Sequence, residues 1–277
     1  DLRLATFGID QSPIVTSPAY GVTCITLHHD TAPLDNANVR NALLLSIRQQ
    51  VYSDASFGAQ LPATGLIPAS FSTPDAAANF RQDNTPLLVT DSVYAQNLVL
   101  AKNLLTEAGY EDVSSLNSLE FIYNEENVMD ESLAELIVQD WNNALGFAPT
   151  LVPLNEEEFS RRLADGEYAM ALTRHTSLID DPGEILSAFV TGMSENVGNY
   201  ASGAFDDLML QAKNADSINQ RYDLYRQAET QLLSDAAVIP LLFHTTQGLE
   251  SDSLDDIVTT ANGYLIFSYC TITPSET

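Results

Sequence analysis

Segments with the hydrophobic pattern of strands alternate along the chain with segments with the hydrophobic period of helices, and together they predict an α/β fold. Short β-prone runs indicate strands over residues 2–7, 22–28, 119–123, 149–153, 168–173, 238–243 and 264–272. Apolar residues at helical spacing indicate helices over residues 37–53, 92–108, 131–145, 156–164, 205–213 and 219–233. One further helix is expected after Asp181, because Pro182 suits the first helical position and an aspartate suits the cap. Residues 57–84 show no sustained period and are expected to form a long ordered loop.

The helix predicted over residues 131–145 has a pronounced apolar stripe. Leu133, Ile137 and Trp141 recur on one face, and Gly146 follows at a position where helices commonly end. We therefore expect Trp141 in the core rather than in a site. Arg40, on the first predicted helix, is expected to bond a backbone carbonyl or a carboxylate within the same domain.

Charge restricts the classes of partner. The 277 residues include 38 acidic and 11 Lys or Arg side chains, which gives a formal net charge of -27. A field of that sign repels phosphate, so nucleic acid and anionic lipid are disfavoured as partners. No apolar run reaches the roughly 18 residues that a membrane-spanning helix needs. The first residues lack the basic start and apolar stretch of a signal peptide, so none is expected there.

The cysteines and histidines give no metal motif. Cys24 and Cys270 lack CxxC spacing, which excludes a zinc ribbon, and they either form one bridge or stay as two buried thiols. His28 and His29 are adjacent in a predicted strand, so their side chains point to opposite faces and cannot both bind one metal ion. The chain also lacks the GxSxG, HExxH, P-loop and GxGxxG motifs. We expect no metal, no cofactor and no catalytic centre.

Seven segments, taken in order, resemble one protein family. They are APLDNANVRNAL over residues 32–43, PATGLIP over 62–68, AKNLLTEAGY over 101–110, DP at 181–182, NY at 199–200 with AFD at 204–206, RYDLYRQAE over 221–229, and DAAVIP over 235–240. In these segments the chain is similar to the extracellular solute-binding proteins of peptide ABC transporters, the oligopeptide- and dipeptide-binding type (family 5). The matched segments belong to the second half of that family's sequences.

The resemblance implies the fold and the division of the chain. It implies an α/β lobe of the periplasmic-binding-protein-like class II type, with a mixed sheet flanked by helices, as one part of a two-lobed clamshell. Residues 1–30 would be strands linking to the absent first lobe, residues 31–244 the C-terminal ligand-binding lobe, and residues 245–277 a return segment toward the first lobe.

The ligand-facing segment implied by the resemblance precedes the Asp181–Pro182 pair. The family carries a Trp and an Asp there, the Asp holding the α-ammonium of a peptide, whereas His175 and Leu178 stand at those positions in this chain. Arg174 would pair either with a ligand carboxylate or with an acid of the protein, and Tyr200 would lie in the site or in the core. The candidate ligand-binding residues are Arg174, His175, Thr176, Ser177, Leu178, Asp180, His28, Asn199 and Tyr200.

The implied function is that of the substrate-binding component of an ABC importer, here in fragment form. It would bind peptides or similar solutes in a cleft between lobes and deliver them to ABC permease subunits, without catalysis. The implied location is extracytoplasmic, as a cell-surface lipoprotein or in the periplasm. One alternative stays within binding, with a non-peptide solute such as a nickel chelate or a sugar. The second is a surface sensor or adhesin that keeps the fold without transport, and the third is an enzyme such as a hydrolase. The replaced Trp and Asp favour the first alternative.

Overall fold

A computed structural model describes residues 14–56, 59–74, 79–81, 91–249, 254–260 and 265–272. The strand predicted over residues 2–7 and part of the loop predicted over 57–84 lie outside the described residues. Within the described part of that loop, the short strand β2 (Leu61–Pro62) pairs with a strand from the far end of the chain.

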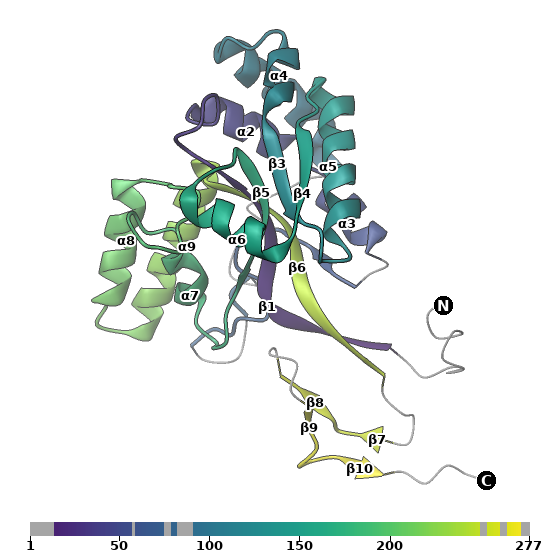
Figure 1. Cartoon of the computed structure of the whole chain (residues 1–277). Coiled ribbons are helices and arrows are strands. Elements are labelled where there is room, and N and C mark those ends of the chain that lie inside the picture. Colours follow the sequence, from purple (N-terminus) through teal and green to yellow (C-terminus); the bar gives the residue numbers. More distant parts are fainter. Residues whose placement is uncertain are drawn as a thin grey trace, which may run out of the picture.

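A mixed sheet of six strands organises the lobe, in the order β2-β6-β1-β5-β3-β4 (Figure 1). β3, β4 and β5 run parallel to one another, whereas β1 is antiparallel to both of its neighbours. β1 and β6 extend side by side well beyond the other strands, toward the end of the lobe where the short strands β7–β10 lie (Figure 1). The strand bounds are β1 Ile14–Leu27, β3 Glu120–Asn124, β4 Thr150–Leu154, β5 Met170–Thr176 and β6 Val238–Leu249.

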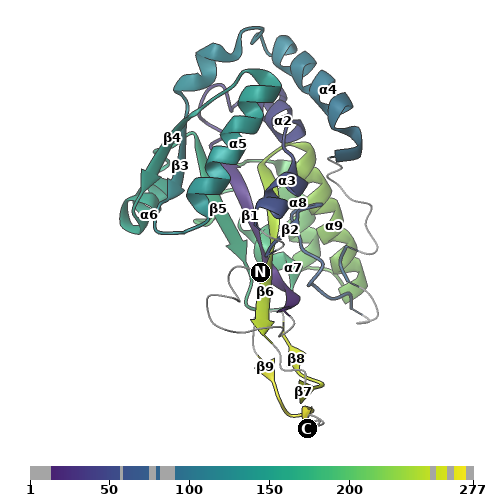
Figure 2. The ribbon, with the colours of Figure 1, turned by 90° about the vertical axis from the view of Figure 1, so that its right-hand side faces the viewer.

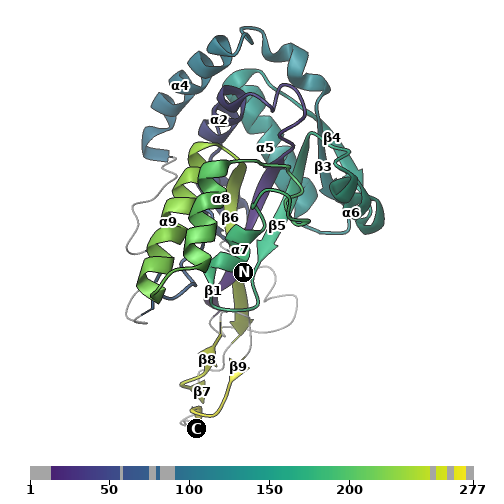
Figure 3. The same cartoon turned by 90° about the vertical axis from the view of Figure 1, so that its left-hand side faces the viewer.

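Helices cover both faces of this sheet (Figures 2 and 3). On one face lie α2 (Ala37–Leu45), α3 (Gln49–Ala55), α4 (Tyr94–Glu107) and α5 (Asp130–Leu145). On the other lie α6 (Glu156–Asp165), α7 (Pro182–Ser187), α8 (Gly203–Lys213) and α9 (Ile218–Ser234). Two 3-10 helices, η1 (Asp91–Val93) and η2 (Val113–Ser118), complete the lobe. The predicted mixed sheet flanked by helices is confirmed.

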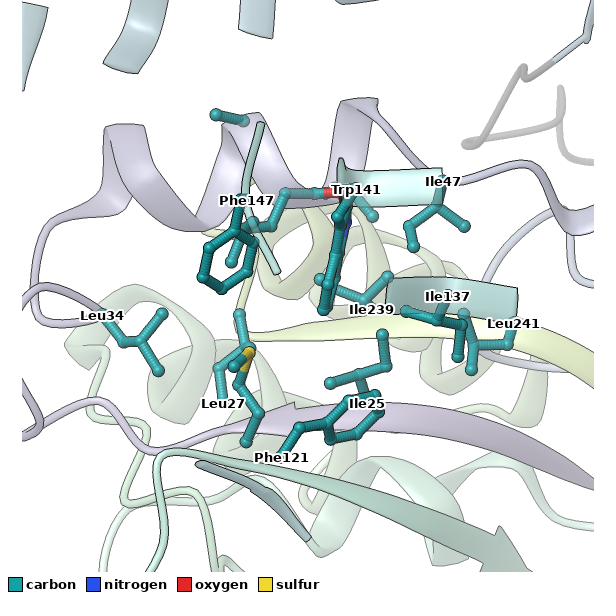
Figure 4. Packing of buried hydrophobic residues seen from close by; sticks show 14 of the residues in the cluster. Ile25, Leu27, Leu34, Ile47, Phe121, Ile137, Trp141, Phe147, Ile239 and Leu241 are labelled. Carbon is teal, nitrogen blue, oxygen red and sulfur yellow. Dashed lines mark hydrogen bonds between the residues drawn. The ribbon is translucent and has the colours of Figure 1, made fainter. Parts of the chain in front are cut away.

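The core on the α5 face is centred on Trp141 (Figure 4). Its indole is fully buried, lies 6.0 Å from the ring of Phe121 and 5.4 Å from that of Phe147, and donates to the Leu43 carbonyl at 3.2 Å. A buried indole N–H needs such an acceptor, since an unpaired polar group in the core costs stability. The prediction of Trp141 as a core residue is confirmed.

The first predicted helix, over residues 37–53, is wrong in one respect, because the structure divides it into α2 and α3. Ser46 follows the last residue of α2, and its hydroxyl donates to the carbonyls of Ala42 and Leu43, both at 2.9 Å. The side chain therefore binds carbonyls of the last turn, and α2 ends there. Gln49 then donates to the Pro240 carbonyl of β6 at 3.1 Å. This contact reaches 191 residues along the chain, so a local hydrophobic period could not reveal it.

The last predicted strand, over residues 264–272, is two short strands instead. β9 (Leu265–Ile266) pairs with β8 (Val258–Thr259), and β10 (Thr271–Ile272) pairs with β7 (Leu254–Asp255). Cys270 lies in the turn between β9 and β10 and is free, as is the buried Cys24 of β1. The structure therefore favours two unpaired thiols over a bridge. Among the described residues, no helix combines the length and the apolar character needed to cross a membrane.

Candidate functional site

The parallel strands set the position of the candidate site. Because β3, β4 and β5 are parallel, their carboxyl ends meet at one edge of the sheet, and open α/β sheets bind ligands at that edge. Two segments include the ends of β3 and β5 and the loops that follow them, residues 124–130 and residues 174–181, and we call them together the carboxyl edge. This edge lies beside the point where β1 and β6 leave the sheet, since Thr176 at the end of β5 pairs with Gly21 of β1.

The loop after β5 is a fixed turn that directs apolar side chains outward. The Ser177 amide donates to the Tyr20 carbonyl at 2.9 Å, which ties the loop to β1. The Ser177 hydroxyl donates to the Ile179 carbonyl at 2.8 Å and lies 3.1 Å from the Ile179 amide. Leu178 is 82% exposed and Ile179 is 53% exposed. The turn therefore presents two aliphatic side chains at the carboxyl edge.

The two aspartates that follow are engaged within the lobe. Asp180 accepts the Ser72 amide at 2.9 Å, and burial of the Tyr20 phenol together with its contact to Asp180 raises the pKa of Tyr20 to about 12. Asp181 accepts the Gly183 amide at 2.8 Å and caps α7, as the sequence predicted. Both carboxylates thus bind backbone of their own chain.

Arg174 and Asp130 join the two segments of the carboxyl edge. The Arg174 guanidinium makes a bidentate pair with Asp130, with one bond of 3.0 Å from Nη1 to Oδ2. The Asp130 side chain is 0% exposed and that of Arg174 is 30% exposed. Of the two roles left open for Arg174, the structure shows the pair with an acid of the protein. That acid balances its charge.

His175 lies on the opposite face of β5 and is packed under the loop. Its ring lies 4.8 Å from that of Phe189, and its Nε2 atom is buried without a hydrogen-bond partner among the described residues. Burial, and secondarily His244, lowers the pKa of His175 to about 4. His244 is held by Thr23, whose Oγ1 lies 2.9 Å from its Nε2, and burial followed by the charge of Arg174 lowers its pKa to about 4. Both imidazoles are therefore neutral near pH 7.

His28, Asn199 and Tyr200 lie at the other end of β1. His28 lies seven positions after Gly21, which corresponds to about 23 Å of extended strand. The His28 ring meets that of Tyr168 edge-on at 5.4 Å, and the Asn199 amide donates to Asp30. The structure therefore groups residues 176–180 and places His28 and Asn199 away from them, whereas Tyr200 lines one small cavity together with His175.

Tyr200 belongs to the core. It is 3% exposed, and its hydroxyl donates to Asp235 at 2.6 Å. Arg40 is also bound within the lobe, since it donates to the Leu34 carbonyl at 2.8 Å and to the Asp235 carbonyl at 2.9 Å. The prediction for Arg40 is confirmed. Of the two roles considered for Tyr200, the core role agrees with its burial.

Met129, Asp130, Thr23 and His244 lie at or beside the carboxyl edge and were missed by the sequence reasoning. A usable signal existed for the first two, because they follow β3, which is parallel to β5, and the carboxyl ends of parallel strands converge. His244 gave no such signal, since its position depends on the pairing of β6 with β1. Within the described part of the chain, no group of three or more His, Cys, Asp and Glu side chains could hold a metal ion.

The chain resembles known proteins in sequence. Residues 4–196 match the family model described as bacterial extracellular solute-binding proteins, family 5 Middle. The probable deoxycholate-binding periplasmic protein YgiS of Escherichia coli is 26% identical over 76% of this chain and 38% of its own length. The dipeptide-binding protein DppE of Bacillus subtilis is 24% identical over 93% of this chain and 46% of its own length. The chain thus spans less than half the length of these two relatives.

Solved structures share the fold. The murein tripeptide binding protein MppA of Escherichia coli superposes with a TM-score of 0.77 at 20% identity, over 95% of this chain and 49% of that one. HbpA2 of Haemophilus parasuis superposes with a TM-score of 0.79 at 24% identity, over 99% of this chain and 52% of that one. Since the family model matches well over half of the residues, the chain belongs to the bacterial extracellular solute-binding proteins of family 5.

Proposed function

We propose that this chain is one lobe of the solute-binding component of an ABC importer for peptides or similar solutes. The observation that carries the proposal is the carboxyl edge, with its outward-facing loop, placed beside the paired strands β1 and β6 where they run out of the lobe (Figure 1). A second lobe joined through those strands would close over a solute held at this edge. The lobe would bind and release the solute without catalysis and without a cofactor.

The division of the chain and its partners belong to the same proposal. Residues 1–30 and 245–277 would lead to the first lobe, and residues 31–244 would form the ligand-binding lobe. The length of the relatives supports a second lobe, because two solved chains that superpose on 95% and 99% of this chain contain about as many residues again. The loaded protein would deliver its solute to permease subunits outside the cytoplasm, either from the periplasm or as a cell-surface lipoprotein.

One observation favours a solute without a free ammonium group. The loop presents Leu178 and Ile179, while Asp180 and Asp181 bind backbone amides of the lobe. An ammonium group binds best to a carboxylate that is free to face it, and both carboxylates of this loop already accept a backbone amide. A non-peptide or N-blocked solute is therefore the second candidate, and the similarity to a protein named for deoxycholate agrees with it.

Nuclear magnetic resonance of the 15N-labelled chain tests the proposal. A pool of tripeptides and the same pool with acetylated N-termini are titrated separately to millimolar concentration. We expect amide shifts confined to residues 124–133 and 174–181, with weak affinity because one lobe supplies only part of the contacts. Shifts confined to other residues, or none with either pool, would contradict the proposal. Mass spectrometry of small molecules that copurify with the protein would then identify the solute.

A further inference from the structure

We infer that a pocket beside the carboxyl edge takes a small, uncharged, branched aliphatic group of the solute, and this inference rests on the proposed function. The pocket lies between the end of α3, the first turns of α5 and the strands β1, β5 and β6. It has an internal volume of about 30 Å³. By the same measure one water molecule needs about 10–15 Å³, so there is room for two or three heavy groups, which admits the branched end of an isopropyl or isobutyl side chain.

The walls of the pocket are aliphatic. Leu133 and Leu136 come from α5, Leu242 from β6, and Met129 from the residue before α5. Met129 is partly exposed at the carboxyl edge, so the pocket opens where a solute would lie. Methionine adapts its shape to an occupant more readily than a branched residue does.

Three of the polar groups that line the pocket are already bonded within the lobe, and Gln60 and Ser132 line it as well. The Tyr52 hydroxyl donates to Asp140 at 2.9 Å, and the Ser56 hydroxyl donates to the Ser53 carbonyl at 2.7 Å. Thr23 holds the His244 ring at 2.9 Å. Water in such a pocket finds few partners, and an apolar group that displaces poorly bonded water gains affinity.

The pocket also carries no unbalanced charge. Arg174 is the one cation in its lining, and the buried Asp130 neutralises it. A charged side chain entering beside this pair would lose its hydration without gaining a free counterion. An aromatic ring exceeds the available volume. A small aliphatic group satisfies both the size and the charge of the pocket.

Three capped amino acids test the inference on the whole chain: N-acetyl-leucine methylamide, N-acetyl-glycine methylamide and N-acetyl-aspartate methylamide. We expect the leucine probe to bind about tenfold more tightly than the glycine probe, because burying an isobutyl group in part is worth about one tenfold step in affinity. The aspartate probe should bind no better than glycine. The methyl resonances of Met129 and Leu136 should shift with the leucine probe. Equal affinity for leucine and glycine, or methyl shifts elsewhere, would overturn the inference.

Two neighbouring exposed residues of α3 supply a blocking variant and its control. Ala55 lines the pocket and Asp54 does not. Ala55→Phe should abolish the preference for leucine, whereas Asp54→Phe should keep it. A preference that survives Ala55→Phe would refute the pocket. If the tripeptide pools shift residues 174–181 but the three probes bind equally, the proposed function stands and the pocket fails. If the leucine probe alone binds, the pocket stands without support for peptide uptake.

Discussion

The buried ion pair between Arg81 and Glu229 holds the loop that supports the carboxyl edge. Glu229 of α9 is 0% exposed and accepts the amides of Leu66 and Ile67 at 2.8 and 2.9 Å, as well as the Arg81 guanidinium. Gly65 lies against this pair, and a Cβ atom there would overlap with Arg81 Nη1. A side chain at position 65 would therefore have to displace the ion pair.

Replacing Arg81 by Met should destabilise the lobe strongly. Breaking a buried pair by removal of one partner costs about 3–5 kcal/mol, since the other charge stays buried. Two features place the expected loss of stability near the lower end of this range. Glu229 keeps its two amide donors, and burial already raises its pKa, so the orphaned carboxyl can escape by taking up a proton. We expect a loss of about 3 kcal/mol at pH 7, and a smaller loss at pH 5, where protonation is easier.

Urea unfolding of three variants measures this loss and separates it from packing. Arg81→Met and Glu229→Gln each leave one partner alone, whereas the double variant leaves no buried charge. The double variant should be more stable than Arg81→Met, because neutral replacements of buried pairs are often tolerated. A loss below about 1 kcal/mol for Arg81→Met would refute the reasoning, and so would single losses that simply add in the double variant.

Arg81→Met should also affect the candidate site. Ser72 belongs to the loop that Glu229 holds, and its amide donates to Asp180. Hydrogen exchange at the Ser72 amide should therefore accelerate in Arg81→Met. The amides of β3 serve as a control: none of these bonds joins β3 to the loop, so their protection should not change. Unchanged exchange at Ser72 would separate the ion pair from the carboxyl edge.

Three further predictions concern single positions. Leu178→Asp should raise the affinity for tripeptides with a free N-terminus over their acetylated forms in titration calorimetry, and equal affinities would mean that the loop does not meet that end of a solute. Gly21→Ala should cost about 1–3 kcal/mol, because its Cβ would overlap with the His244 ring, and the added change His244→Ala should recover most of it unless the strain lies in the backbone. His175 is kept neutral by burial, with a pKa of about 4 against about 6.5 when unfolded, so its contribution to stability is complete above pH 6.5 and falls as the pH drops toward 4. Between pH 7 and pH 4.5, the free energy of unfolding of His175→Gln should fall by about 2 kcal/mol less than that of the unmodified chain. Equal falls in the two proteins would exclude the effect.

Much of the secondary structure could be predicted from local signals. The caps illustrate this: Asp181 caps α7, and Gly146 ends α5 in the left-handed conformation, with φ at 77°. The first helix could not be placed in full, because α2 ends on a serine side chain and α3 is anchored to β6. The candidate site could be predicted from the sequence only in part. Residues 174–181 were found through the family resemblance, whereas Asp130 was missed because it meets Arg174 only across the sheet.

By itself, the sequence determined the α/β class, the core position of Trp141 and the family. Each depends on order along the chain, either as a hydrophobic period or as motifs in series. Only the tertiary structure decided the neighbours of each polar side chain. Arg174 is balanced by an acid 44 residues away, and Asp180 is tied to a loop 108 residues away. A hydrogen bond or ion pair depends on distances of about 3 Å between atoms, and strand pairing sets those distances without regard to separation in the sequence.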